Sequence, residues 1–376
     1  MVYLLLLGAL ALASCQPDPS GPANQGPYGR IETFAGTGVA GKGDDTPRLH
    51  QAQLYLPQDL TLGPDGQFYI LDWNNHRIRV TASGRLQTLI GTGELGDAPA
   101  GPALEIGLNH PTHIAFDSLG RLILSAWHNS KILRYDFSSG LIEAICGTGE
   151  RAYGGDGGPA DQALINLPSS TAFDLSGRMY ISDQENQRVR RVDMDGTIST
   201  VIGTGVAGFS GDGGLATEAQ IYAPQGQAAP PTSRIAADQQ GHIYLADTFN
   251  NRIRRLSPDG VITTIAGNGV FPPDASLQAR SSAPALDVSL HWPCDVAPDR
   301  AGNLFIADTF NNCVRRLGTD GLLTTVAGQC GKPGDTGDGG HPLQALLNRP
   351  YGIEVDLEGN LYIADTRNHR IRVVHK

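Results

Sequence analysis

Short stretches in which apolar residues alternate with polar ones, or run on for about four to seven residues, occur along almost the whole chain. Turn residues, above all Gly, Pro, Asp and Asn, separate these stretches from one another. Stretches of this length and periodicity, bounded in this way, are typical of β-strands. The sequence therefore predicts an all-β protein with almost no helix.

The predicted strands follow one another in a repeated order. One copy reads "PYGIEVD", a Gly turn, "NLYIAD", a short polar turn and "HRIRVV", and earlier copies add a fourth run such as "TTIAG". The residue that ends the second run recurs about every 60 residues, a period that fits one four-stranded blade of a propeller. In the six copies this residue is Asp72, Ala126, Asp183, Asp247, Asp308 and Asp365.

The two ends of the repeated region complete each other. The last copy stops after its third strand, and "RIETFAGTG" at residues 30–38 copies the fourth strand "VITTIAGNG" at residues 261–269. A ring closed by both ends leaves no sheet with an unpaired edge. We therefore expect residues 30–376 to form a six-bladed β-propeller of four-stranded antiparallel blades, with the N-terminal strand paired to the C-terminal blade.

The phrases "ADTRNHRIRV" and "ADTFNNRIRR" are similar to NHL repeats, and the similarity covers residues 30–376. The recurrent "GDGG" followed by Ala-x-x-Ala-x-Leu resembles the NHL propellers of bacterial surface proteins and of teneurins. Asp and Asn of the repeated turn are expected to bond backbone N–H groups, and the Arg that follows to pair with an Asp or a carbonyl group. Asp156, Asp212 and Asp338 of the "GDGG" loops are expected to cap short helices.

The N-terminus carries a candidate export signal. Residues 1–15, "MVYLLLLGALALASC", form a short apolar run that ends in small residues and a cysteine. Leu12–Cys15 resembles a bacterial lipobox, which implies lipidation of Cys15, and Gln16 resembles the outer-membrane variety. A plain signal peptide cut nearby is the alternative. Residues 16–29 are rich in Pro and Gly and are predicted to be a disordered tether. The protein would then be exported, in the periplasm or at the cell surface, and anchored to the outer membrane through lipid alone.

Charge and cysteine content add two expectations. The chain has 376 residues and a net charge of -10, which disfavours nucleic acid as a partner. An exported protein can oxidise its cysteines. The repeat places Cys313 and Cys330 on neighbouring strands near the same end, so this pair is the predicted disulfide.

Positions that share a place in the repeat but differ in chemistry are candidates for function, because the scaffold does not dictate them. We read the residue just before the apolar part of the first strand in each copy. These residues are Asp59, His113, Ser170, Arg234, Asp295 and Gly352. The first strands line the channel of a propeller, so these side chains should meet at its mouth and form a ligand site.

Two interpretations of this ring of residues remain open. Asp59, His113 and Asp295 could hold a divalent ion, Ca²⁺ or Zn²⁺, while Arg234 pairs with a carboxylate of a ligand. Alternatively, the polar groups satisfy one another in a wet channel mouth. The metal interpretation would suit a lyase or a lactonase-like hydrolase, whereas no confident cofactor or catalytic residue emerges from the sequence.

The chain has three tryptophans, Trp73, Trp127 and Trp292, and all fall in segments assigned to the same face. Large rigid rings on loops suit sugars, peptides or partner proteins, so we expect an aromatic patch there. The preferred hypothesis is a monomeric binding propeller for a glycan, peptide or protein ligand. A metal-dependent enzyme and a purely structural module are the alternatives.

Overall fold

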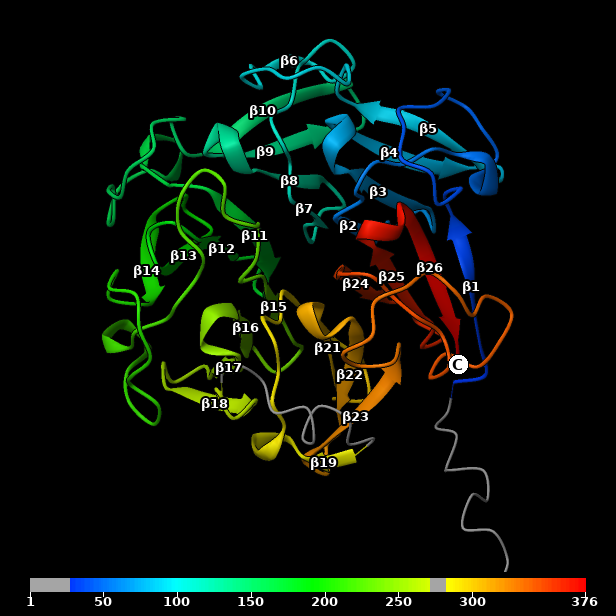
Figure 1. The fold of residues 1–376 in the computed structure, drawn as a ribbon. Helices are drawn as coiled ribbons and strands as arrows, with labels where there is room; N and C mark the ends of the chain where they lie inside the picture. The colour runs from blue at the N-terminus through cyan, green and yellow to red at the C-terminus, as the bar shows by residue number, and fades with distance from the viewer. Residues whose placement is uncertain (1–27, 271–281) are drawn as a thin grey trace, which may run out of the picture.

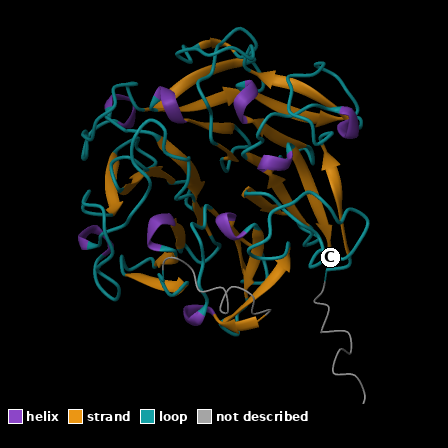
Figure 2. Ribbon diagram, viewed as in Figure 1, coloured by secondary structure: helices purple, strands orange, loops and turns teal. Residues whose placement is uncertain are grey.

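Six β-sheets surround a central axis in the computed structural model, which describes residues 28–270 and 282–376 (Figure 1). In each antiparallel sheet the first strand lies beside the axis, and the first strands of neighbouring blades contact one another. Strands and loops make up nearly all of the described chain (Figure 2). The six-bladed propeller predicted from the repeat is confirmed.

The blades follow the chain in order. Blade 1 contains β2 (Asp59–Leu62), β3 (Phe68–Asp72), β4 (Arg77–Ala82) and β5 (Arg85–Ile90). Blade 2 contains β7 (His113–Phe116), β8 (Leu122–Ala126), β9 (Lys131–Asp136) and β10 (Leu141–Cys146). Blade 3 contains β11 (Pro168–Phe173), β12 (Met179–Asp183), β13 (Arg188–Val192) and β14 (Ile198–Ile202).

The second half of the ring repeats the same plan. Blade 4 contains β15 (Ile235–Ala237), β16 (Ile243–Asp247), β17 (Arg252–Leu256) and β18 (Ile262–Ala266). Blade 5 contains β20 (Asp295–Pro298), β21 (Leu304–Asp308), β22 (Cys313–Leu317) and β23 (Leu322–Ala327). Blade 6 contains β24 (Pro350–Val355), β25 (Leu361–Asp365), β26 (Arg370–His375) and β1 (Arg30–Ala35).

Helices in the described ranges are three-residue 3-10 turns, and none of them is long and apolar enough to cross a membrane. They are η1 (Leu49–Gln51), η2 (Trp73–Asn75), η3 (Trp127–Asn129), η4 (Ala160–Gln162), η5 (Ala216–Glu218), η6 (Thr248–Asn250), η7 (Ala285–Asp287), η8 (Thr309–Asn311) and η9 (Thr366–Asn368). Five of them, η2, η3, η6, η8 and η9, form the turn between the second and third strands of a blade.

Two blades have a fifth strand that the repeat did not predict. β6 (Gly101–Pro102) pairs with β10, and β19 (Ser282–Pro284) pairs with β23. In both cases the segment that enters a blade runs along that blade's outermost strand. Such pairing satisfies backbone groups that would otherwise form an exposed edge. The expectation of four strands in every blade is therefore corrected for blades 2 and 5.

The closure of the ring is confirmed by the pairing of β1 with β26, in which Ile31 lies opposite Val374. Ordered contacts begin before the predicted boundary: Tyr28 is buried against Phe305, and the Gly29 N–H donates to the His375 carbonyl oxygen over 2.9 Å. The predicted tether is thus two residues too long at its end. The predicted signal peptide, Cys15 and residues 16–27 lie outside the described residues.

Six clusters of buried apolar side chains fill the spaces between neighbouring blades. Between blades 5 and 6, for example, Ile31, Leu347 and Ile363 are fully buried together. Each sheet therefore buries both faces against its neighbours, so no blade has a core of its own.

The repeated turn forms the hydrogen bonds that its residues predict. In blade 4, Asp247 Oδ1 accepts from the Tyr222 N–H over 2.8 Å. Asn250 Nδ2 donates to Asp247 over 2.9 Å and to the Gly208 carbonyl oxygen over 2.8 Å. Asn251 then adopts a left-handed conformation with φ of 53°. The Asp and Asn therefore join the turn to the loop that enters the blade, as expected for a structural role.

The aspartates of the "GDGG" loops bind a buried arginine. Arg254 is fully buried and lies 2.8 Å from Asp212 and 3.6 Å from Asp247. Asp212 also accepts from the Thr264 hydroxyl over 2.6 Å. The expectation that these aspartates cap helices was wrong: Leu215 occupies the N-cap of η5, and no side chain caps it. Asp156 and Asp338 make equivalent ion pairs in their blades.

The second copy compensates for its missing aspartate. Ala126 stands at the Asp position, and Asn129 Oδ1 accepts the Asn109 N–H over 3.1 Å instead. Leu133 replaces the buried arginine and is itself buried among apolar side chains. The blade therefore loses the ion pair but keeps the link between its turn and the entering loop.

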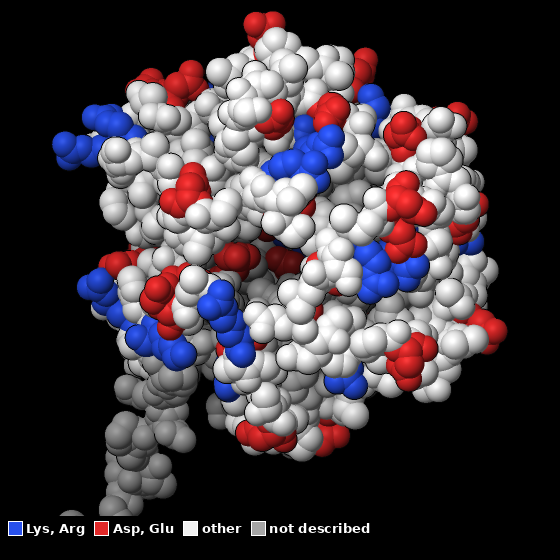
Figure 3. All heavy atoms as spheres, turned by 180° about the vertical axis from the view of Figure 1, so that it is seen from behind, with Lys and Arg blue, Asp and Glu red and all other residues white. Residues whose placement is uncertain are grey.

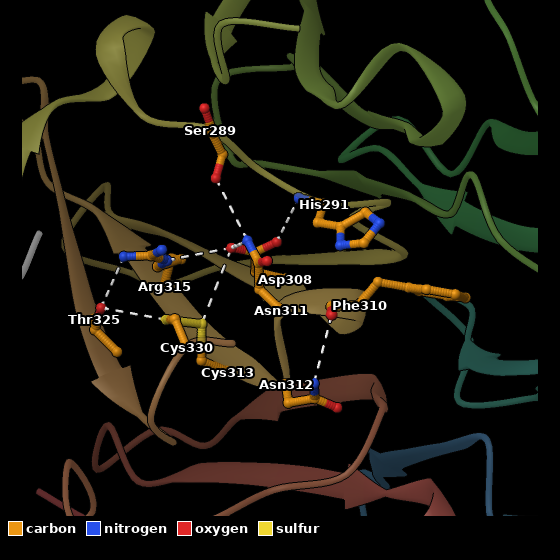
Figure 4. The surroundings of a disulfide bond; sticks show 10 residues. All are labelled: Ser289, His291, Asp308, Phe310, Asn311, Asn312, Cys313, Arg315, Thr325 and Cys330. Carbon is orange, nitrogen blue, oxygen red and sulfur yellow. Dashed lines mark hydrogen bonds and ion pairs between the residues drawn. A yellow bond between two sulfur atoms is a disulfide. The ribbon is translucent and has the colours of Figure 1, made fainter. Parts of the chain in front are cut away.

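The predicted disulfide is present between Cys313 and Cys330, with a Cα–Cα distance of 5.1 Å (Figure 4). Cys313 stands where blades 1, 3, 4 and 6 have an arginine. In blade 4 this arginine, Arg252, donates to the Asn268 carbonyl oxygen in the loop after the fourth strand. The disulfide makes the equivalent connection covalently. Cys146 and Cys294 are buried free thiols.

Candidate functional site

Arg234 lies fully buried on the propeller axis. It extends from blade 4, and its Nη1 lies 3.1 Å from Asp59 Oδ1 and 3.4 Å from Asp295 Oδ2. Its Nη2 donates to the carbonyl oxygens of Gln58, over 3.0 Å, and Thr112, over 2.6 Å. The guanidinium therefore joins blades 1, 2, 4 and 5, and its side chain obstructs the channel.

The histidine and serine of the predicted ring also lie in this layer, Ser170 fully buried and His113 partly exposed. His113 Nε2 lies 3.9 Å from Asp59 Oδ2, and the Thr171 N–H donates to His113 Nδ1 over 3.4 Å. Burial lowers the pKa of His113 to about 3, so its imidazole is neutral. The Ile235 N–H donates to Ser170 Oγ over 3.0 Å. Both side chains therefore connect neighbouring blades.

Burial and ion pairing act in opposite directions on the two aspartates. Burial raises the pKa of Asp59 to about 6, although Arg234 and the Ile114 N–H, 2.9 Å away, stabilise its charged form. Burial likewise raises the pKa of Asp295, whose Oδ2 accepts from the Ile353 N–H over 3.0 Å. The layer therefore holds two carboxylates against one permanently charged guanidinium.

The sixth position of the ring is a glycine because there is no room for a side chain. A Cβ atom on Gly352 would lie 2.6 Å from the Gln58 carbonyl oxygen and 2.7 Å from Asp59 Oδ1. The structure thus brings the six positions together in one layer. The sequence left open whether their polar groups satisfy one another or bind a ligand.

The geometry does not support the metal site suggested for Asp59, His113 and Asp295. The guanidinium of Arg234 supplies the positive charge that faces both carboxylates. Among the residues that the structure describes, no group of three or more His, Cys, Asp or Glu is arranged to hold a metal ion. The interpretation in which the polar groups satisfy one another fits this layer.

A pocket of about 300 Å³ lies on the face formed by the turns between second and third strands. Its lining residues come from blades 1, 2 and 6 and from the loop that enters blade 4. They are Leu56, Gln58, Trp73, His110, Trp127, His128, Gln227, Ala228, Ala229, Pro230, Pro231, Tyr351, Thr366 and Arg367. We call this the upper pocket. It brings together two of the three predicted tryptophans.

Four rings form one side of the upper pocket. Trp73 packs against His110 with ring centroids 4.7 Å apart, and His110 packs against His128 at 5.1 Å. His128 stacks on Trp127 at 4.2 Å, with an angle of 21° between the ring planes. Burial, together with the neighbouring His110, lowers the pKa of His128 to about 4. This wall is therefore aromatic and uncharged at neutral pH.

The pocket residues carry buried polar atoms without a partner in the described part of the chain. These atoms are the indole Nε1 groups of Trp73 and Trp127 and the side-chain oxygen Oε1 of Gln58. A buried donor or acceptor left unsatisfied costs about 1–3 kcal/mol. Two donors and one acceptor of the lining residues thus have no hydrogen-bond partner among the described residues.

The third tryptophan belongs to a different group of rings. Trp292 packs against Phe249 at 4.7 Å and against Phe310 at 4.5 Å. The guanidinium carbon of Arg349 lies 3.5 Å from the centre of the Phe310 ring. The prediction of one patch containing all three tryptophans is therefore corrected: Trp292 is not among the residues that line the upper pocket.

Sequence reasoning missed Gln58, His110 and Tyr351 as pocket residues. Gln58 lies next to the residue chosen in its copy, and the other two lie within three residues of theirs. A wider window around the start of each first strand would have included all three. Their orientation toward the upper pocket depends on the loops between blades, which differ in length and sequence.

Comparison with known proteins matches the chain to the teneurin NHL domain over residues 45–210 and 205–376. Teneurin-3 of Danio rerio is 28% identical over 348 residues, and human teneurin-1 is 27% identical over 354 residues. These alignments cover 86% and 87% of this chain but 12% of each teneurin. The chain thus spans only a small part of the length of these relatives.

Solved structures share the fold at low sequence identity. An auxiliary nutrient binding protein from Bacteroides ovatus has a TM-score of 0.64 and 16% identity, covering 92% of this chain and 76% of its own. A putative gluconolactonase has a TM-score of 0.54 and 13% identity, covering 92% of this chain and 97% of its own. Identity at this level supports the fold alone. The match to the family, which spans nearly the whole propeller, shows that the chain belongs to the teneurin NHL domain family.

Proposed function

We propose that this propeller is a binding protein whose upper pocket accepts a carbohydrate. The observation that carries the proposal is the pair of buried, unpartnered indole N–H groups of Trp73 and Trp127 beside the unpartnered Oε1 of Gln58. Sugar hydroxyl groups can accept from the two indoles and donate to the amide oxygen. The faces of the sugar ring can pack on the aromatic wall.

The size of the upper pocket and its uncharged aromatic wall support binding of one sugar unit. Its volume of about 300 Å³ lies at the small end of the range for ligand sites. The histidines of the wall are neutral at physiological pH, because burial lowers the pKa of His128 to about 4 and also lowers the pKa of His110. A terminal unit of a longer glycan would enter the pocket while the rest of the chain stays outside.

Binding of the full-length chain to glycan and peptide arrays, followed by calorimetry with the glycans that bind, tests this function. Trp73→Ala removes ring contact and a donor, and Trp127→Phe keeps a ring but loses the N–H. We expect each change to lower the affinity about tenfold, the effect of one hydrogen bond to a buried partner. Trp292→Phe is the matched control and should leave the affinity unchanged.

Two results would contradict the proposal. Selective binding of peptides without any glycan would assign the pocket to another ligand class. Equal loss of glycan affinity in Trp292→Phe and Trp127→Phe would place the ligand outside the upper pocket.

A further inference from the structure

The two faces of the propeller differ in the charge of their central cavities. On the other side of the Arg234 layer lies a cavity of about 280 Å³, lined by residues of the first strand of every blade. The face of the molecule seen in Figure 3 is hollowed near its centre, and acidic atoms lie within the hollow. The ionisable residues that line this lower cavity are Asp59, Asp295, Glu354 and the neutral His113. The lower cavity therefore offers no positive charge to an anion.

The upper pocket has the opposite set of ionisable groups. Its described lining residues include no Asp or Glu, and Arg367 is the one permanently charged residue among them. The two histidines of the wall, His110 and His128, are neutral. The upper pocket is therefore locally positive, although the whole chain has a net charge of -10.

The side chain of Arg367 has no partner within the described part of the chain. The residue lies in η9, the turn between the second and third strands of blade 6, and is exposed. Its backbone N–H donates to the Asn348 carbonyl oxygen over 3.0 Å, but its guanidinium makes no ion pair or hydrogen bond with a described residue. At the same place in the repeat, the other copies have Asn74, His128, Glu185, Phe249 and Phe310. The turn itself therefore does not require an arginine.

A second guanidinium and a hydroxyl group lie near Arg367. Arg349 packs on the ring of Phe310 at 3.5 Å and forms no ion pair with a described residue. Burial lowers the pKa of Arg349, and the charge of Arg367 lowers it further. Burial raises the pKa of Tyr351, which lines the upper pocket, and the charges of Arg349 and Arg367 oppose this rise. Two positive charges therefore act on one neutral hydroxyl donor of the pocket.

We propose that the sugar bound in the upper pocket carries a carboxylate, as a hexuronic acid does, and that Arg367 selects it. The inference rests on the proposed function of the pocket and specifies its ligand. The guanidinium of Arg367 would donate two parallel N–H bonds to the carboxylate, the arrangement for which arginine is best suited. The hydroxyl of Tyr351 would donate to the carboxylate or to a neighbouring hydroxyl group of the sugar.

The size of the upper pocket fits a hexuronic acid as well as it fits a neutral hexose. In a hexuronic acid the carboxylate replaces the terminal hydroxymethyl group, so the ring and its overall size stay nearly the same. The remaining ring face can still pack on the aromatic wall formed by Trp73 and Trp127. Charge, rather than size, therefore distinguishes the two ligands in this pocket.

Calorimetric titration of the full-length chain with matched sugars tests the inference. The pairs are methyl glucoside with methyl glucuronide, methyl galactoside with methyl galacturonide, and lactose with sialyllactose, which tests a larger carboxylated sugar. In at least one pair, we expect the carboxylated member to bind about tenfold tighter, the effect of a hydrogen-bonded charge. This advantage should shrink in about 0.5 M salt, because salt screens an exposed guanidinium.

Variants of the exposed arginine separate the two parts of the ligand. Arg367→Gln should lower the affinity for the carboxylated sugar about tenfold and change the affinity for its neutral partner less than about twofold. Arg367→Lys should restore part of the loss, because it keeps the charge but not the two parallel donors. Arg300→Gln, at an exposed position between β20 and β21, is the matched control and should leave both affinities unchanged.

The outcomes distinguish this inference from the proposed function. Neutral sugars that bind as tightly as their carboxylated partners would overturn the inference and leave the carbohydrate function in place. An advantage of the carboxylate that persists in Arg367→Gln would overturn it as well, because another group would then bind the charge. If no sugar binds, neutral or carboxylated, the proposed function fails and the inference fails with it.

Discussion

Arg234 is fully buried on the axis, where it faces two carboxylates and two backbone carbonyl groups contributed by blades 1, 2 and 5. A charge in such a place is stable only while its partners remain. The arginine and the aspartates therefore have to be considered together. Removal of one member leaves the others buried and unpaired.

We predict that Arg234→Met lowers the free energy of unfolding by about 3–5 kcal/mol at pH 8. The loss should be smaller at pH 5. Burial holds the pKa of Asp59 at about 6 in the folded protein, above that of an unfolded Asp, so protonation stabilises the folded state as the pH falls through this range. Without Arg234 the aspartates depend more strongly on protonation.

Denaturant titrations at the two pH values measure this difference. Arg300→Met, at an exposed position, should change the unfolding free energy by less than about 0.5 kcal/mol. An equal loss at pH 5 and pH 8 would mean that the unpaired aspartates are not the cause.

The sequence predicted which residues meet on the axis, because the repeat fixes which position opens the first strand of each copy. It could not predict that Arg234 reaches the far side of the channel. That contact depends on backbone carbonyls of Gln58 and Thr112, more than a hundred residues away in the chain.

At the scale of the structural element, each blade carries the same connection between its central turn and the neighbouring loops, but by different chemistry. Blade 4 uses Asp247, and blade 2 uses Asn129. Blade 5 replaces an arginine by the Cys313–Cys330 disulfide. The repeat frame predicted the disulfide because it assigned Cys313 and Cys330 to neighbouring strands near the same end. The strands β6 and β19 could not be predicted, because they lie in loops outside the frame.

We predict that reduction of the disulfide lowers the free energy of unfolding by about 3 kcal/mol, since the closed loop, with a sequence separation of 17, no longer restricts the unfolded chain. Denaturation with and without a reducing agent measures the change. The double variant Cys313→Ala/Cys330→Ala should give the same result in both conditions. A remaining effect of the reducing agent in this variant would assign the stabilisation to another cysteine.

At the scale of the whole molecule, the ring depends on β1. Ile31 is fully buried between blades 5 and 6. Its N–H donates to the Gly340 carbonyl oxygen, and its own carbonyl oxygen accepts from the Gly339 N–H. β1 is thus held by β26 on one edge and by the loop that enters blade 6 on the other. The alternation of this short strand was enough to predict its place, because it copies the missing fourth strand.

We predict that Ile31→Asp lowers the free energy of unfolding by more than about 4 kcal/mol, because it places an unpaired charge in an apolar cluster. It should also increase hydrogen exchange along β26, whose outer edge would open. Arg30→Asp introduces the same residue at the adjacent exposed position and should have a small effect. Similar destabilisation by both changes would show that β1 contributes little to closure.

Because the guanidinium of Arg234 lies on the axis, the molecule has two separate cavities, one opening on each face, with the Arg234 layer between them. A solute that enters from one side has no straight route to the other, so the propeller cannot act as a conduit. A ligand in one cavity could affect the other cavity only by displacing Arg234 or its partners. An effect of a ligand bound at one face on binding at the other face would therefore have to disappear when Arg234 is replaced.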